Sequence, residues 1–198
     1  EIFNSTILEH LKGQAAIGHV LYTTDVGNRE NVQPIVVKYK SGQMAMSYNG
    51  SLINTSALRQ KLEEKGAIFQ TNNDPELIAS LISIYRITSG EIEDAIVKVM
   101  EDIKGAYSFI LMTQNKLIAV RDPFGMKPLC LGKLDNSYIV ASESSAIDAV
   151  GGTLLRDINP GEIVVIQENG IRSIQTEVPG KTGLCIFEFV YTARQDSY

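Results

Sequence analysis

Apolar residues recur at helical spacing in four stretches of the chain. The pattern predicts helices over residues 1–12, 56–65, 75–85 and about 91–104, and Gly13, Gly66 and Gly105 stand where three of them end. Before the third helix, Asp74 is expected as the N-cap and Pro75 as the first helical residue.

Alternating or continuous apolar runs bounded by turn residues predict strands over most of the remaining chain. The expected strands are residues 15–23, 35–40, 43–48, 67–70, 107–113, 117–121, 129–133, 137–141, 163–167 and 171–175. Their short connections favour antiparallel pairing. The order of elements therefore predicts an α+β fold in which helices cover the faces of antiparallel sheets.

The stretch around Asn49 and Gly50 combines a strand with a helix that begins a few residues later. An asparagine amide and a glycine backbone N–H can together hold a developing oxyanion. Asn-Gly is also the strongest signal for a two-residue hairpin turn, and spacing alone favours that simpler interpretation. Asp74 has two interpretations as well: a carboxylate aimed at an ammonium group, or an ordinary helix cap.

Composition narrows the classes of function. The 198 residues carry a net charge of −5, with 44% hydrophobic and 21% charged residues, which is typical of a soluble globular protein with one main domain. The sequence has no cluster of basic residues of the kind that binds nucleic acid, so we expect no nucleic-acid partner. No apolar run is long enough to cross a membrane, so we expect no membrane partner. The two cysteines, Cys130 and Cys185, fit a reducing compartment, so we expect a cytoplasmic location. Cys130 lies in a buried-looking strand and is expected to be inert.

Seven short motifs follow one another along the chain: Ala-Ile-Gly-His-Val-Leu-Tyr-Thr-Thr (16–24), Asn-Val-Gln-Pro (31–34), Ser-Tyr-Asn-Gly-Ser-Leu (47–52), Asn-Asp-Pro-Glu (73–76), Arg-Asp-Pro-Phe-Gly-Met-Lys-Pro-Leu (121–129), Ala-Ser-Glu-Ser (141–144) and Asn-Pro-Gly-Glu (159–162). Taken in this order, they resemble the glutaminase domain of class II glutamine amidotransferases, and most closely that of the amidophosphoribosyltransferases. The stretch 185–197 looks like the junction into a phosphoribosyltransferase domain, which argues against an asparagine synthetase.

The resemblance implies a four-layer αββα sandwich of antiparallel sheets, the N-terminal-nucleophile hydrolase fold, truncated at its N-terminus. Residues 1–180 would form the glutaminase-like domain, and residues 181–198 would lead into a phosphoribosyltransferase domain outside this chain. A parent homo-oligomer is expected. The parent would hydrolyse glutamine and transfer the ammonia to phosphoribosyl pyrophosphate, giving phosphoribosylamine for purine biosynthesis.

The same resemblance implies roles for individual residues. Asn49 and Gly50 match the oxyanion hole, Thr24 a contact to the glutamine carboxylate, and Asp74 the carboxylate that holds the substrate ammonium. The family's nucleophile is an N-terminal cysteine, whereas residue 1 here is Glu1. We therefore expect this chain alone to be inactive.

Two further expectations follow from matched positions. Leu21 stands where the family has an arginine that binds the glutamine α-carboxylate, so a degenerate, non-catalytic domain that binds a small ligand or serves as a scaffold is the alternative function. Cys185 resembles a ligand of the iron–sulfur cluster found in some relatives. A cluster normally needs four thiolates, so any cluster, like any Mg²⁺ of the parent, would need residues outside this chain.

Overall fold

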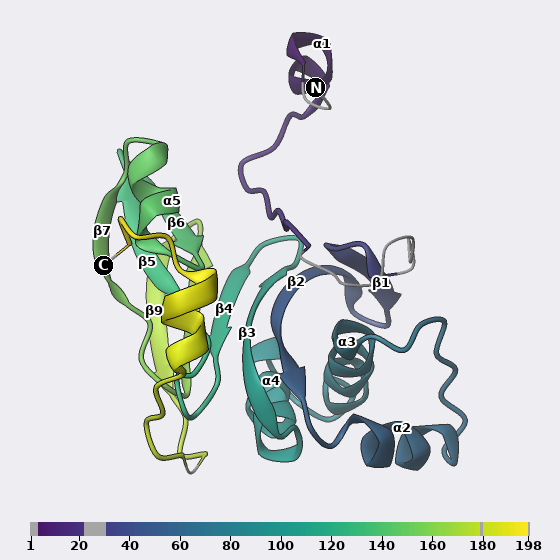
Figure 1. The fold of residues 1–198 in the computed structure, drawn as a ribbon. Helices are drawn as coiled ribbons and strands as arrows, with labels where there is room; N and C mark the ends of the chain where they lie inside the picture. Colours follow the sequence, from purple (N-terminus) through teal and green to yellow (C-terminus); the bar gives the residue numbers. More distant parts are fainter. Residues whose placement is uncertain (1–3, 22–30, 179, 198) are drawn as a thin grey trace.

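Two antiparallel sheets packed face to face form the centre of the molecule (Figure 1). The structure is a computed structural model that describes residues 4–21, 31–178 and 180–197. The six-stranded sheet has the order β1-β2-β3-β4-β8-β9 and the three-stranded sheet the order β6-β5-β7. The bounds of the strands are β1 Ile35–Tyr39, β2 Gly42–Leu52, β3 Gly105–Met112, β4 Leu117–Arg121, β5 Cys130–Leu134, β6 Ser137–Ala141, β7 Thr153–Asp157, β8 Glu162–Gln167 and β9 Gly170–Gln175.

Three helices cover one face of the six-stranded sheet. They are α2 (Thr55–Glu63), α3 (Asp74–Tyr85) and α4 (Ile92–Asp102), and their apolar stripes pack on alternate residues of β2, β3, β4 and β8. This is the larger core, and it contains fully buried Tyr107, Phe109 and Leu111 from β3. Because strand side chains alternate between faces, the intervening residues are free to build a second core.

The second core lies between the two sheets. Ala119 and Val164 of the six-stranded sheet meet Leu131 of the three-stranded sheet there, with Leu129 and Ile158 beside them. On the outer face of the small sheet, helix α5 (Ser144–Ala149) places Ile147 so close to Gly132 that a Cβ there would lie 2.7 Å from the Ile147 side chain. The layers therefore run helix, sheet, sheet, helix, which confirms the expected αββα order.

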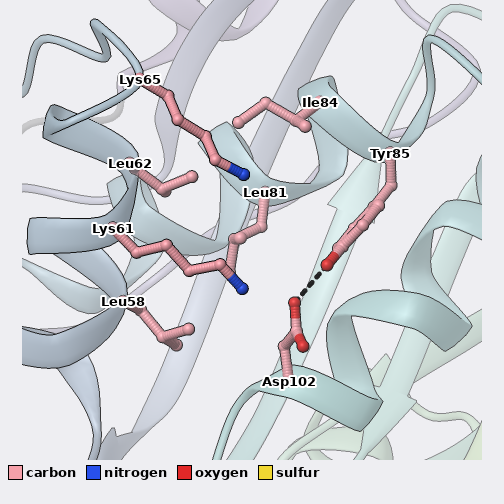
Figure 2. A pocket seen from close by; sticks show the side chains of 8 residues that line it. All are labelled: Leu58, Lys61, Leu62, Lys65, Leu81, Ile84, Tyr85 and Asp102. Carbon is pink, nitrogen blue, oxygen red and sulfur yellow. Dashed lines mark hydrogen bonds between the residues drawn. The ribbon is translucent and has the colours of Figure 1, made fainter.

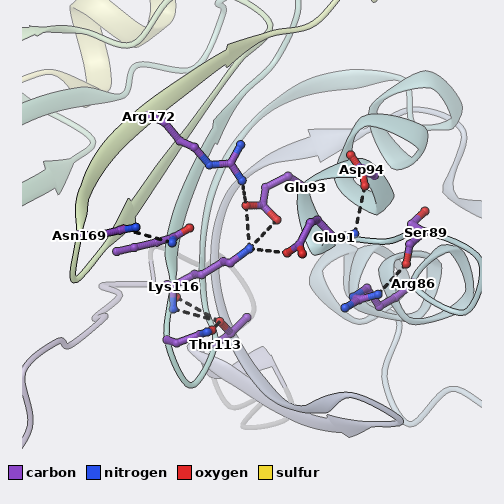
Figure 3. A network of polar contacts seen from close by, with 11 residues as sticks. Arg86, Ser89, Glu91, Glu93, Asp94, Thr113, Lys116, Asn169 and Arg172 are labelled. Atoms are coloured by element: carbon purple, nitrogen blue, oxygen red, sulfur yellow. Dashed lines mark hydrogen bonds and ion pairs between the residues drawn. The ribbon is translucent and has the colours of Figure 1, made fainter.

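A buried charge cluster fastens the start of α4 to two strands of the six-stranded sheet (Figure 3). Lys116, just before β4, donates to Glu93 at 2.9 Å and to Glu91 at 2.7 Å, and Arg172 of β9 donates to the same Glu93 carboxylate. The Glu93 side chain is only 2% exposed. A carboxylate buried so deeply is stable only when it is paired, so these two cations are required for α4 to pack here.

The loop that carries the chain from the large sheet to the small one is organised by one carboxylate. Asp122 is fully buried and accepts backbone N–H groups from Phe124 at 2.9 Å, Lys127 at 3.2 Å and Met126 at 3.3 Å. The Arg121 guanidinium donates to the Gly125 and Lys127 carbonyls within this loop and to the Ile158 carbonyl beyond β7. The hydrogen bonds of Arg121 and Asp122 thus explain the Arg-Asp motif by the structure of this loop.

Residues beyond β9 return to this loop and to the small sheet. Lys127 pairs with Glu188 of the short π-helix η2 (Glu188–Thr192) at 2.7 Å, and Ser197 donates to Glu143 at 3.2 Å. Figure 1 shows this helix in yellow beside the three-stranded sheet. The expected domain boundary at residue 180 stays a prediction. None of the described helices is long and apolar enough to span a membrane.

Two expected strands are wrong where the structure describes them. Residues 15–21 form neither helix nor strand. Residues 67–70 are irregular as well, because the Glu76 side chain accepts the backbone N–H groups of Gln70 and Thr71 at 2.7 and 2.8 Å. Arg59 holds the same segment by donating to the Thr71 carbonyl. Side chains satisfy groups that a strand partner would otherwise bind.

Other differences concern length and short elements. The expected helix over residues 1–12 is observed as α1 (Ser5–His10), apart from the sheets (Figure 1). Strand β7 and helix α5 were not predicted. The apolar residues of β7, Leu154 and Leu155, are adjacent and do not alternate with polar ones, and the six residues of α5 are too few to show helical spacing.

Candidate functional site

Asn49 and Gly50 lie inside strand β2 and not in a turn. Asn49 pairs with Ser108 and Gly50 with Tyr107 of β3, and the strand continues to Leu52. The hairpin-turn interpretation is therefore wrong. Beyond Met46, however, β1 no longer pairs with β2, so among the residues that the structure describes no strand lies along the far edge of this part of β2.

Glycine is required at position 50 by close packing against β3. A Cβ on Gly50 would lie 2.3 Å from the Ala106 carbonyl oxygen, and a Cβ on Gly105 would lie 2.3 Å from the Ser51 carbonyl oxygen. Atoms cannot approach so closely, so both positions exclude a side chain. The backbone of Gly50 is therefore packed closely against β3 on one side, and its other side has no strand beside it among the described residues.

The Gly50 N–H points to the open edge of β2. Tyr107, its partner in β3, turns its own carbonyl and N–H away towards Asp122, so Gly50 does not exchange hydrogen bonds with it. The N–H groups two residues before and after Gly50 face the open edge too: Tyr48 donates to Gln33 and Leu52 donates to Asp74. Among the described residues, Gly50 N–H has no recorded partner.

Asp74 joins this edge and does not cap helix α3. The N-cap is Asn73, whose side chain accepts the Glu76 N–H at 3.0 Å, so the expectation that Asp74 is the cap is wrong. The Asp74 carboxylate instead accepts from the Leu52 N–H at 2.9 Å, the Tyr48 hydroxyl at 3.0 Å and the Thr55 hydroxyl at 2.9 Å.

Burial and the neighbouring Asp74 carboxylate keep the Tyr48 phenol protonated. Burial, and then the Asp74 carboxylate, raise the pKa of the Tyr48 phenol far above its usual range, so Tyr48 stays a neutral donor. A carboxylate has about four acceptor positions and three are used here. Asp74 thus keeps about one acceptor position for a cationic ligand. The carboxylate binds at Leu52, two residues along β2 from the Gly50 N–H, which has no partner among the described residues.

The Asn49 side chain leaves β2 on the face opposite Tyr48, because successive side chains alternate. Ser47 shares that face and its hydroxyl donates to the Gly18 carbonyl at 3.3 Å, which brings residues near 18 towards Asn49. Leu21, in the same segment, is 38% exposed. Thr24 lies outside the described residues.

Neither cysteine has the surroundings of a nucleophile. Burial raises the pKa of the Cys130 thiol to about 11, and the thiol donates to the Ala141 carbonyl, so it is an inert core group as expected. Cys185 is half-buried just before η2. No group of three or more His, Cys, Asp or Glu side chains that could hold a metal occurs within the described residues.

A separate pocket of about 80 Å³ lies between α2, α3 and the end of α4 (Figure 2). Leucines form its floor, Lys61 and Lys65 project over it, and Tyr85 donates to Asp102 at one side. That hydrogen bond, followed by burial, raises the pKa of Tyr85 to about 12. None of the expected site residues lines this pocket, so the site candidate remains the open edge of β2.

Three residues of this edge were not identified from the sequence: Gln33, Tyr48 and Thr55. Tyr48 and Gln33 stand within the motifs at 47–52 and 31–34, which was the available signal. Their partners lie between 15 and 26 residues away along the chain, and such pairings become visible only in three dimensions.

Comparison with known proteins gives consistent similarities. The glutamine amidotransferase domain family matches residues 19–149. The amidophosphoribosyltransferases of Archaeoglobus fulgidus and Bacillus subtilis are 41% and 40% identical over the whole chain, which covers 43% and 41% of their lengths. The solved glutamine phosphoribosylpyrophosphate amidotransferase from B. subtilis, complexed with ADP and GMP, superposes with a TM-score of 0.83 at 39% identity, over 91% of this chain and 39% of that one.

We predict that Tyr48 and Asp74 are energetically coupled. Tyr48→Phe should lower the free energy of unfolding by about 1.5–3 kcal/mol, as expected for a hydrogen bond to a charged group, and should cost clearly less in an Asp74→Asn background. Urea unfolding of the two single variants and the double variant measures the coupling. Tyr39→Phe is the control, since no partner of the Tyr39 hydroxyl is recorded in the described part of the chain. Equal losses for Tyr48→Phe in both backgrounds would contradict the contact.

Proposed function

Because this chain belongs to the glutamine amidotransferase domain family, we propose that the open edge of β2 is its glutamine site. The observation that carries the proposal is a Gly50 N–H that has no partner among the described residues and lies two residues from the Leu52 N–H, which donates to the Asp74 carboxylate. A donor for the side-chain carbonyl and an acceptor for the α-ammonium, placed at one strand edge, match the two polar ends of an amino acid.

In the proposed chemistry, Gly50 N–H and the Asn49 amide donate to the oxygen of the substrate amide. Attack by a thiolate moves negative charge onto that oxygen, and donors held in place before the reaction stabilise the charge without reorganising. The Asp74 carboxylate, fixed in place by the three hydrogen bonds that it accepts, holds the ammonium and thereby orients the amide. The close packing of Gly50 on β3 keeps the donor rigid.

The chain spans about two fifths of the length of the relatives it matches, so the activity of the whole protein is also part of the proposal. We infer that the whole protein hydrolyses glutamine to glutamate and ammonia, and that the ammonia displaces pyrophosphate from phosphoribosyl pyrophosphate to give phosphoribosylamine. Two relatives of known structure support this: one is the B. subtilis amidotransferase, and the other is described as the allosteric regulatory enzyme of purine biosynthesis, with a TM-score of 0.79. A homo-oligomer is proposed as well.

The described residues do not fit an iron–sulfur cluster or an Mg²⁺ site by themselves. Cys130 is buried in the core, and the described residues contain no group of three or more His, Cys, Asp or Glu side chains that could hold a metal ion. The proposed roles of Asn49, Gly50 and Asp74 therefore involve neither metal. Cys185 as a cluster ligand of the longer protein stays a prediction.

Leu21 favours a second candidate, a glutaminase-like domain that binds a small ligand without catalysis. An exposed leucine offers no hydrogen bond to a carboxylate. The two candidates differ in one simple property, which is whether the longer protein releases ammonia from glutamine.

We predict that the 198-residue chain alone hydrolyses no glutamine. Cys130 is buried and its thiol donates to the Ala141 carbonyl, and neither thiol forms a hydrogen bond to an amine or imidazole of the described residues. Ammonia release from L-glutamine, followed with a coupled dehydrogenase assay, should equal that of a heat-denatured sample. Ammonia release above that of the heat-denatured sample, abolished by Cys130→Ala or Cys185→Ala, would show that one of these thiols is a nucleophile and would contradict the predicted inactivity.

A second prediction concerns Leu21. Leu21→Arg should raise the affinity for L-glutamine by about tenfold or more, because a charged hydrogen bond to the α-carboxylate contributes about 1.5–3 kcal/mol. Calorimetric titration gives the affinities, and Leu21→Met is the matched control without charge. An unchanged affinity in Leu21→Arg, with the fold intact, would place the carboxylate elsewhere.

A further inference from the structure

We propose that Gln33 is a positioning residue of this site, and that it acts with Asp74 to leave Gly50 as the one outward-facing N–H donor of residues 48–52 that has no partner in the described part of the chain. The proposal rests on the proposed function, since it says how the oxyanion donor is selected. Gln33 does not contact the substrate in this account. It acts through the backbone of β2.

The geometry comes from three outward-facing N–H groups in a row. Tyr48 N–H donates to the Gln33 side-chain oxygen at 2.7 Å, and Leu52 N–H donates to Asp74 at 2.9 Å. Backbone N–H groups of a strand point alternately to its two edges, so the Gly50 N–H lies on the same edge as those of Tyr48 and Leu52 and midway between them. Two side chains from separate parts of the chain thus occupy the donors on both sides of one free donor.

This arrangement solves a problem of exposed strand edges. A row of free N–H and carbonyl groups accepts any extended peptide as an additional strand. With Tyr48 and Leu52 occupied, an incoming strand could not form the regular ladder, whereas one small acceptor could still reach Gly50. The edge therefore selects a single oxygen atom, which suits a substrate amide and disfavours a peptide.

A glutamine side chain suits position 33 better than a glutamate side chain would. The Gln33 amide oxygen accepts a hydrogen bond without carrying a charge. A carboxylate would accept the same N–H, but its negative charge would have no cation beside it, unlike that of Asp74, which pairs with the substrate ammonium in the proposed function. This uncompensated charge would disfavour the negative charge that develops on the substrate oxygen. A residue that served only to fold the loop would not need to be neutral.

Hydrogen exchange of individual backbone amides tests the arrangement directly. In the wild-type chain, Tyr48 and Leu52 should be protected, and Gly50 should exchange within about tenfold of an unprotected peptide. Gln33→Met, which keeps the size of the side chain but removes its acceptor, should speed exchange at Tyr48 by about fivefold or more and leave Leu52 unchanged. Gln33→Glu should restore the protection of Tyr48. Protection of Gly50 equal to that of Tyr48, or unchanged exchange at Tyr48 in Gln33→Met, would overturn the proposal.

Adding L-glutamine separates this inference from the proposed function. Saturating L-glutamine should slow exchange at Gly50 in the wild type, and Gln33→Glu should weaken this effect although it restores Tyr48. If glutamine changes no exchange rate while the wild-type pattern holds, the proposed function fails and the edge arrangement stands. If Gln33→Glu responds to glutamine exactly as the wild type does, the need for a neutral acceptor at residue 33 is refuted.

Discussion

The Asp74 carboxylate is the interaction on which the candidate site depends. It connects the end of β2, through Leu52 and Tyr48, with the start of α2 at Thr55 and the first turn of α3. A charged group with three donors is stable in a half-buried position, and removal of the carboxylate would leave the buried Tyr48 hydroxyl without a partner. One side chain therefore sets both the local packing and the electrostatics at the strand edge.

Close packing of the backbone provides the second constraint. Gly50 and Gly105 allow β2 and β3 to approach where neither residue could carry a side chain. Strand β3 fixes the Gly50 backbone on one side. At the opposite edge of β2, Gln33 and Asp74 accept the N–H groups of Tyr48 and Leu52, which lie two residues before and after Gly50. Pre-arranged donors of this kind are the main means by which enzymes stabilise an oxyanion, since they avoid reorganisation during the reaction.

Much of the fold could be predicted from the sequence because its signals are local. The helices α2, α3 and α4 follow from their apolar spacing, and strands such as β8 and β9 from turn residues around apolar runs. Residues 67–70 look like a strand by composition, yet the Glu76 carboxylate binds the N–H groups that would have paired. Asn49-Gly50 likewise resembles a turn by composition. Its strand partners in β3, Ser108 and Tyr107, lie far away along the chain and cannot be recognised from the local sequence.

The candidate site was predictable only in part, through resemblance to a family of known chemistry. That resemblance indicated Asn49, Gly50 and Asp74, and the structure brings Asp74 to the strand edge at Gly50, while their roles stay predictions. The partners of the strand edge, Gln33 and Tyr48, join segments far apart in sequence and could not be read from a local pattern.

The most direct measurement is a crystal structure of the longer protein with L-glutamine bound. This account predicts that the side-chain carbonyl oxygen of glutamine lies within hydrogen-bonding distance of Gly50 N and Asn49 Nδ2, and that the α-ammonium contacts the Asp74 carboxylate. Glutamine bound away from β2, or bound there with its ammonium distant from Asp74, would contradict it.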